Sequence, residues 1–254
     1  MKNKSQTILF VLMLLVGLCQ AQEDQPVLSP DRPGYTWGAE VLALHKISWE
    51  NGFGFESSPD GARTTTLNTT ILRYGLFENM ELRVGTDFLM LNDGLSPEST
   101  FGVSPVTFGT KLKVYESNSW LPSIGLLAEF SSPHLGSKDL RPSHIAPSVY
   151  ALFEHSINDR LWLCYNAGLE WDGETATPLT VLSMALGFSI TDEVGAFIDS
   201  YNYFHPDDGN QYMTEIGVTW MVSRRLQLDL ECDLDWQQLG KYYSFGGGIA
   251  WMIN

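Results

Sequence analysis

Hydrophobic and polar residues alternate along residues 225–236, RLQLDLECDLDW. Even positions from 226 to 236 carry Leu, Leu, Leu, Cys, Leu and Trp, and odd positions from 227 to 235 carry Gln, Asp, Glu, Asp and Asp. Successive strand side chains point to opposite faces, so the pattern predicts a β-strand with one apolar and one acidic face. Wound as a helix, these residues would form no apolar stripe. The run is close to the roughly 9–11 residues with which a tilted strand crosses a bilayer.

The alternation and the turn signals between segments continue to the end of the chain. We expect twelve strands, at about 35–48, 62–76, 80–91, 103–116, 121–132, 144–156, 160–172, 177–190, 194–205, 211–222, 225–236 and 242–253. Short turns, such as 158–159 and 223–224, alternate with longer polar connections, such as 50–61 and 133–143. This rhythm predicts an all-β protein: a single antiparallel transmembrane β-barrel of about 12 strands with short periplasmic turns and longer outer loops. A secreted β-sandwich or lipocalin-like binder is the alternative, although its strands would usually be shorter.

The N-terminus has the features of a secretory signal peptide. Lys2 and Lys4 precede an apolar run at 8–18 that is too short to span a membrane, and cleavage is expected before Gln22. A lipoprotein acylated at Cys19 is the alternative. The expected organisation is therefore a signal peptide at 1–21, an extended polar lead-in at 22–34 that is either flexible or tucked into the barrel, and an outer-membrane β-barrel at 35–254.

Charge and cysteine content narrow the functional classes. The formal net charge is −15, and no basic patch appears, so nucleic acid is not an expected partner. Cys164 and Cys232 are the cysteines of the mature chain, and they either form a disulfide or serve as two small apolar side chains. Neither a C-x-x-C motif nor a His-rich zinc spacing is present, so no metal or other cofactor is expected.

Two features suit insertion into an outer membrane. Aromatic residues gather near the expected strand ends, as in the aromatic girdles of membrane barrels. The last segment, 242–253, is aromatic and apolar on one parity. It resembles the C-terminal signal for barrel insertion, although the chain ends on Asn254 rather than on an aromatic residue. The expected partners are outer-membrane lipid, the barrel-insertion machinery acting through this strand, and an unknown small solute.

Several segments carry a family resemblance: DRPG at 31–34, GLFENMELRVG at 75–85, SPVTFGTKLKV at 104–114, the run from 141 to 173, and GFSITDEVGAFIDSY at 187–201. Together they resemble the outer-membrane transporter-type family labelled "putative MetA-pathway of phenol degradation". The resemblance covers about residue 31 to the C-terminus. It implies a barrel with a transport role and brings no catalytic residues, and nothing in the sequence derives an aromatic substrate.

Charged residues on the polar parity are the candidates for the lumen. As pore candidates we select Glu40, Arg83, Asp87, Lys111, Lys113, Glu129, Glu154, Glu170, Asp199, Asp229, Glu231, Asp233 and Asp235, with Lys46, Asp172 and Glu215 as further wall residues. An open lumen rich in acid predicts cation preference. The alternative is that Arg83, Lys111 and Lys113 pair with acids and plug the interior. Twelve strands fall between barrels that side chains fill and those with wide aqueous channels, so any pore is expected to be narrow.

Catalysis and metal binding are not expected. Ser143–His144 and His155–Ser156 are adjacent pairs, but neighbours on a strand point to opposite faces. The nucleophile-elbow pattern G-x-S-x-G does not occur. The run at 207–210, DDGN, lacks the full spacing of a calcium loop and is expected to be a polar turn. The sequence thus predicts a narrow, cation-leaning outer-membrane channel or transporter for small solutes, with a non-transporting structural or surface-binding barrel as the alternative.

Overall fold

The computed structural model of the chain describes residues 26–254 except 97, 118 and 206–208. The expected signal peptide, with Cys19, and part of the run at 207–210 lie outside the described residues. The described chain is all-β. Its strands are β1 Ile47–Ser57, β2 Arg63–Phe77, β3 Met80–Asn92, β4 Thr100–Val103, β5 Thr107–Tyr115, β6 Ser123–Ser131, β7 Ala146–Asn158, β8 Leu161–Glu170, β9 Leu179–Ser189, β10 Val194–Phe204, β11 Gln211–Ser223, β12 Leu226–Asp235 and β13 Tyr243–Met252.

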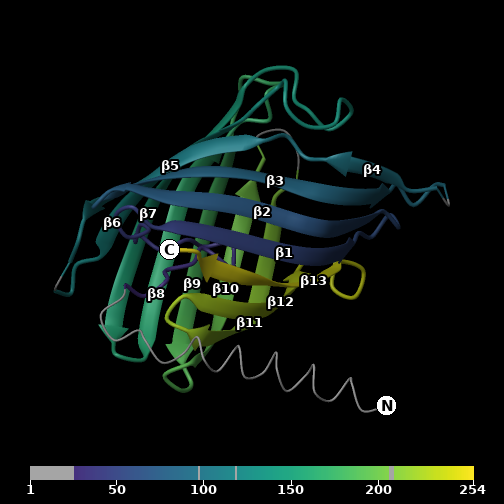
Figure 1. Ribbon diagram of the computed structural model, residues 1–254. Coiled ribbons are helices and arrows are strands. Elements are labelled where there is room, and N and C mark those ends of the chain that lie inside the picture. Colours follow the sequence, from purple (N-terminus) through teal and green to yellow (C-terminus); the bar gives the residue numbers. More distant parts are fainter. Residues whose placement is uncertain (1–25, 97, 118, 206–208) are drawn as a thin grey trace, which may run out of the picture.

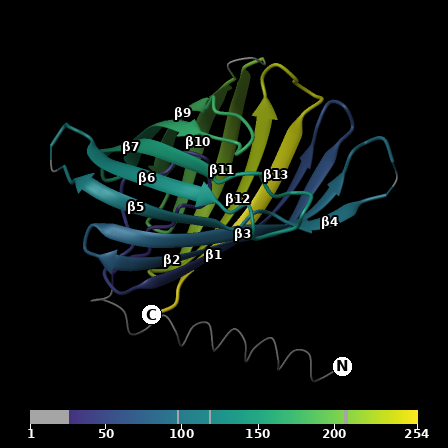
Figure 2. The same ribbon diagram turned by 90° about the horizontal axis from the view of Figure 1, so that it is seen from above.

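Twelve of these strands close into an antiparallel barrel. Neighbours in sequence pair in succession, and β1 closes the ring by pairing with both β13 and β2. The remaining strand, β4, pairs with residues 88–91 of β3, whereas β5 pairs with residues 80–85 of the same strand. The wall formed by β1, β2 and β3 lies across the barrel from β9 and β10 (Figures 1 and 2). The predicted barrel of about 12 strands is confirmed.

The position of the first strand was predicted wrongly. The wall begins at Ile47, so 35–46 is not part of it, and most of the expected loop at 50–61 belongs to β1. The segment at 35–42 alternates, but its apolar side chains pack inside the barrel. Leu42, for example, is buried with Leu28, Ala250 and Met252. By contrast, β1 contains Gly52, Gly54 and the charged Glu50, residue types that favour a loop when only the sequence is considered. In the structure Glu50 is buried.

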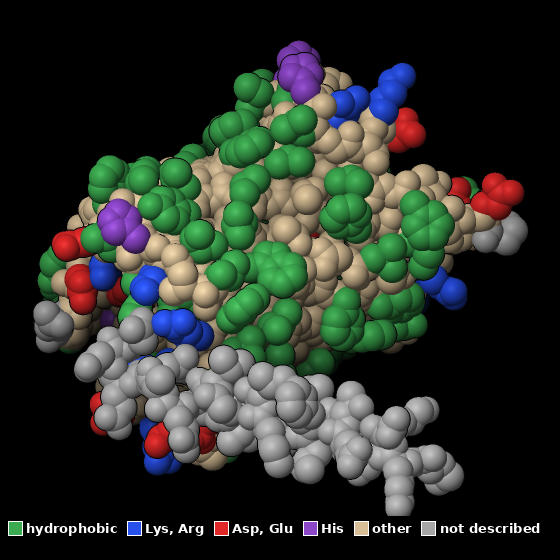
Figure 3. All heavy atoms as spheres, viewed as in Figure 1, with side chains coloured by type: hydrophobic (Ala, Val, Ile, Leu, Met, Phe, Trp, Pro, Cys, Tyr) green, Lys and Arg blue, Asp and Glu red, His purple; other side chains and the backbone are tan. Residues whose placement is uncertain are grey.

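Apolar side chains cover the outer surface of the barrel. On β12 Leu228, Leu230 and Leu234 are exposed, whereas Asp229, Asp233 and Asp235 are buried in the interior. Hydrophobic side chains are spread across the face in Figure 3, and the charged ones lie near its margins. A membrane barrel shows this arrangement of lipid-facing apolar and inward-facing polar residues. None of the described residues forms a helix long and apolar enough to cross a membrane.

Charge placed in the middle of the apolar surface should destabilise the barrel. Leu230 lies in the middle of β12 and is 59% exposed. We expect Leu230→Arg to lower the free energy of unfolding by about 2–4 kcal/mol in lipid vesicles, because the guanidinium would meet hydrocarbon. Phe77→Arg, at the turn end of β2, is the depth control and should cost about 0–1 kcal/mol. Equal losses in denaturant titrations would show that this surface does not face the bilayer interior.

Candidate functional site in the barrel lumen

The segment at 26–46, here called the inner segment, lies mostly inside the barrel before the chain enters the wall. It belongs to no strand, so its backbone amides need partners other than a neighbouring strand. Lumen-facing side chains accept hydrogen bonds from these amides: Asp199 from Tyr35 at 3.0 Å and Thr36 at 2.7 Å, Asn166 from Trp37 at 2.8 Å, Glu154 from Ala39 at 2.8 Å, and Glu81 from Leu42 at 2.7 Å. Wall side chains thus bind the inner segment along its length.

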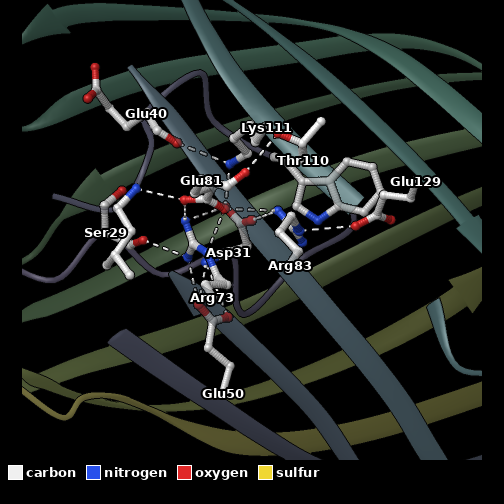
Figure 4. A network of polar contacts seen from close by, with 12 residues as sticks. Ser29, Asp31, Glu40, Glu50, Arg73, Glu81, Arg83, Thr110, Lys111 and Glu129 are labelled. Carbon is white, nitrogen blue, oxygen red and sulfur yellow. Dashed lines mark hydrogen bonds and ion pairs between the residues drawn. The ribbon is translucent and has the colours of Figure 1, made fainter. Parts of the chain in front are cut away.

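Asp31 of the inner segment lies at the centre of a buried charge cluster (Figure 4). Its carboxylate accepts a hydrogen bond from Lys111 Nζ at 2.6 Å and pairs with Arg83 Nη1. Arg73 Nη2 lies 3.8 Å from Asp31 Oδ1. Three cations on β2, β3 and β5 therefore converge on one carboxylate, and charge-assisted contacts of this kind are the strong ones.

Two wall carboxylates complete the charge balance around Arg73. Glu81 accepts hydrogen bonds from Arg73 Nε and Nη2, both at 2.8 Å. Glu50 accepts one from Nη1 at 2.6 Å, and the backbone carbonyl of Ser29 accepts another from the same nitrogen at 2.8 Å. Arg73, Glu50 and Glu81 are fully buried. Because buried charges are tolerated only when paired, this cluster fixes both the wall and the inner segment.

Arg32 contacts a different part of the wall. Its Nη2 donates to Asp229 Oδ1 at 2.9 Å and lies 3.6 Å from Glu231 Oε1. Its carbonyl accepts a hydrogen bond from Gln227 Nε2 at 2.8 Å. Space for the guanidinium comes from Gly52 and Gly248: a Cβ there would lie 2.3 Å from Arg32 Nη1 and 2.4 Å from its Nε, respectively. Small residues on β1 and β13 thus make room for the ion pair with β12.

Filling the space beside Arg32 should cost stability. A Cβ at Gly52 would collide with the Arg32 guanidinium, whereas at Gly54 the nearest atoms would lie 3.8 Å away. We expect Gly52→Ala to lower the free energy of unfolding by about 1–3 kcal/mol through overpacking and displacement of Arg32. Gly54→Ala, on the same strand, is the matched control. Equal losses in chemical unfolding of the two variants would contradict the contact.

Aromatic residues pack around Tyr35 and Trp37, nearer the long-loop end. The ring of Tyr35 stacks on Tyr201 with centroids 4.7 Å apart, and that of Trp37 meets Tyr150 edge-on at 5.0 Å. Hydroxyl groups of Tyr35 and Tyr150 donate to Glu170. These contacts hold the middle of the inner segment against β7, β8 and β10.

Cavities lie on both sides of this aromatic cluster. One of about 610 Å³ reaches Asp31, Arg32 and Trp37 from the short-turn end, where Arg160 and Leu161 line it. The other, of about 800 Å³, extends from Tyr35 and Tyr201 to the long connections around Asp60 and Gln238. The inner segment lines both and separates them.

Most of the predicted pore residues lie in the lumen, as the following contacts show. Glu40 is on the inner segment, where its carboxylate pairs with Lys113 at 3.1 Å and its carbonyl accepts from Lys111. Glu129 lies 3.0 Å from Arg83 Nε. The predicted residues that contact the inner segment are Arg83, Lys111, Lys113, Glu154, Glu170, Asp199, Asp229 and Glu231. Tyr201 and Ser244 donate hydrogen bonds to Asp233, and the Gln237 amide donates one to Asp235. Asp87 lies on the same inward-facing parity of β3 as Arg83.

Three further residues were also assigned to the lumen from the sequence. Glu215 is buried on β11, opposite both Asp199 and Asp233 in the strand register. Lys46 precedes β1 and is half-buried. Asp172 instead lies in the exposed β8–β9 connection, where the alternation has already ended. There the backbone amides of Thr175 and Glu174 donate to its carboxylate, which holds the pKa of Asp172 below its usual value.

Five central residues were missed from the sequence: Asp31, Arg32, Glu50, Arg73 and Glu81. Asp31 was noticed only within the resembling DRPG run, and Glu50 fell in an expected loop. Arg32 belongs to the same DRPG run as Asp31. Arg73 lies in a threonine-rich strand that shows weak alternation. The one usable signal was that Arg73, Glu81 and Arg83 fall on the inward parity of a single hairpin.

The cysteines and histidines form no site among the described residues. Cys164 and Cys232 are both free thiols, the first buried and the second half-buried, so the disulfide alternative does not hold. His155 stacks on Tyr165 on β7 and β8. In the described part of the chain no group of three or more His, Cys, Asp or Glu residues is placed to hold a metal ion.

Comparisons with known proteins agree with the barrel. An outer membrane channel from Pseudomonas putida F1 superposes with a TM-score of 0.70 at 14% identity, covering 87% of this chain and 99% of that chain. The KdgM porin in complex with disordered oligogalacturonate gives 0.60 at 9% identity (82% and 99% covered), and the NanC porin 0.57 at 10% (80% and 98%). At such identities the likeness shows the fold. The comparison with curated proteins found no match.

The family comparison covers nearly the whole described chain. A single family model matches residues 30–253, from the inner segment to the end of β13. The match includes Asp31 and Arg32 as well as the wall, and it confirms the resemblance noted from the sequence. The chain belongs to the family described as "Putative MetA-pathway of phenol degradation".

Proposed function

We propose that the protein is an outer-membrane channel for small solutes whose lumen prefers cations and is closed by the inner segment. The observation that carries the proposal is the pair of cavities, about 610 and 800 Å³, inside one closed barrel on either side of that segment. Displacing the segment would join them into a path along the barrel. The relatives in fold include a channel and porins, which supports transport as the role.

The cation preference rests on the charges of the wall. Carboxylates face the lumen from most strands, including Glu154, Asp199, Glu215 and Asp233, whereas strand-borne lysines and arginines are confined to β2, β3 and β5. Inside a narrow pore, rings of Asp and Glu favour cations. The short turns and both chain ends would face the periplasm, and the apolar strand β13 would be the segment recognised by the insertion machinery.

Single-channel recording of the mature protein in a planar bilayer tests the proposal. Under a potassium chloride gradient we expect discrete current steps with a reversal potential on the cation side. Neutralising Glu215 and Asp233 together, as Gln and Asn, should move that potential toward zero. Anion-selective steps would overturn the cation preference and leave the channel standing.

A second function is favoured by the contacts of the inner segment. Buried ion pairs of Asp31 and hydrogen bonds from the segment's backbone amides to wall side chains hold it in the lumen, as expected for a barrel that serves as a structural or surface-binding protein. Stable insertion without current, even in variants that weaken these contacts, would favour this function over transport.

A further inference from the structure

The lysines and arginines of the barrel wall are confined to one side of the lumen. Of the strands that the structure describes, only β2, β3 and β5 contain lysine or arginine. Arg73, Arg83 and Lys111 point inward from these three strands. On the other side of β1 and β13, β12 presents Asp229 and Glu231. At the level of Asp31 and Arg32 the lumen therefore has one side that carries the cations, paired in part with Glu50, Glu81 and Glu129, and one side that carries acids alone. These are called the cationic side and the acidic side.

The inner segment matches this division with two consecutive residues. The Asp31 carboxylate contacts Arg73, Arg83 and Lys111, and the adjacent Arg32 guanidinium contacts Asp229 and Glu231. Each residue fits only the side it touches, because exchanging them would place like charges together. The two side chains, taken together, have the charges of one small dipolar ligand.

Asp31 and Arg32 cover the two sides, and the acidic side has an unpaired oxygen. The cavity at the short-turn end is lined by both Asp31 and Arg32, so a solute entering there meets these two residues, which cover the two sides. The Asp229 side chain is fully buried, yet its Oδ2 has no hydrogen-bond partner in the described part of the chain. An unpaired buried carboxylate oxygen is costly, and a bound ammonium or guanidinium would satisfy it.

We propose that these two sides form the solute site of the channel and that its ligands are small zwitterions. In the closed barrel Asp31 and Arg32 occupy the positions that the carboxylate and the cationic group of such a ligand would take. This inference rests on the proposed transport function. The solute carboxylate would bind Arg73, Arg83 and Lys111, and its amine or guanidinium would bind Asp229 and Glu231. A solute with one charge satisfies one side only, and leaves the other dependent on the inner segment. A zwitterion replaces both contacts, so it can displace the segment and open the path.

Calorimetric titration of the detergent-purified full chain measures the ligand preference. The probes are γ-aminobutyrate, 4-aminobutanamide, which lacks the carboxylate, and butyrate, which lacks the amine. We expect γ-aminobutyrate to bind more tightly than either analogue. We expect Asp31→Asn to tighten its binding on the order of tenfold, because the solute no longer competes with a resident carboxylate. Arg32→Gln vacates the acidic side and provides an independent variant.

Matched substitutions locate the site. In the Asp31→Asn background, Lys111→Met should abolish the gain in affinity, whereas Arg160→Met, which removes a charge from the same cavity without touching Asp31, should preserve it. Equal binding of the three probes, or equal effects of the two substitutions, would overturn the inference. Liposome swelling with the same solutes separates the two proposals: zwitterion binding without flux in any variant rejects transport, and flux without zwitterion preference rejects only this site.

Discussion

Replacing Arg73 by alanine should cause the largest loss of stability of any single substitution considered. The side chain is fully buried and makes hydrogen bonds to Glu50, Glu81 and the carbonyl of Ser29. Its removal would leave Glu50 and Glu81 buried without their principal counter-charge. Breaking a buried pair from one side typically costs about 3–5 kcal/mol, and we expect a loss of that size in the free energy of unfolding.

Chemical unfolding of the refolded barrel measures this effect. Arg63→Ala is the control, because Arg63 lies on the same strand and is exposed, and it should change stability by no more than about 0.5 kcal/mol. The double variant Arg73→Met, Glu81→Met should lose less than Arg73→Ala, since removing both partners leaves fewer uncompensated charges. A loss below about 1 kcal/mol for Arg73→Ala would show that the cluster does not stabilise the fold.

Replacing Asp199 by alanine should release the inner segment and raise channel activity. Asp199 is fully buried and accepts three hydrogen bonds from the segment, from the amides of Tyr35 and Thr36 and from Thr36 Oγ1 at 2.7 Å. A hydrogen bond to a charged group is worth about 1.5–3 kcal/mol. Counting only two of the three, the substitution would destabilise the closed arrangement by at least about 3–6 kcal/mol, or more than about a hundredfold in its equilibrium constant.

Single-channel open probability measures the release. A second readout is the accessibility to a water-soluble thiol reagent of a cysteine placed at Ser29, in a barrel whose free Cys164 and Cys232 are replaced by serine. Asp199→Asn retains a carbonyl acceptor and should have the smaller effect on both. Ser183→Ala, on the neighbouring inward-facing wall of β9, contacts Asn166 rather than the segment and serves as the control. If the Asp199→Ala barrel inserts but its current and labelling match those of the parent, the hydrogen bonds to Asp199 do not hold the channel closed.

The sequence by itself determined the class of fold. Period-two alternation over long segments, with short and long connections in turn, led to a twelve-stranded barrel because a strand has only two faces and a barrel assigns one to lipid. On β12 burial follows this parity where it is clear, with Leu230 exposed and Asp229 buried. The charged lumen candidates followed from the same parity, because their side chains must avoid hydrocarbon.

Only the tertiary structure decided what fills the barrel. Alternation around Tyr35 and Trp37 looks like a strand, and nothing in its period distinguishes a face packed against lipid from one packed against Tyr150 and Tyr201. The partners of Asp31 are 42, 52 and 80 residues away along the chain, so their convergence depends on strand register and ring closure. Sequence pattern reports the face of each residue, whereas contacts across the lumen arise only when the barrel closes around the inner segment.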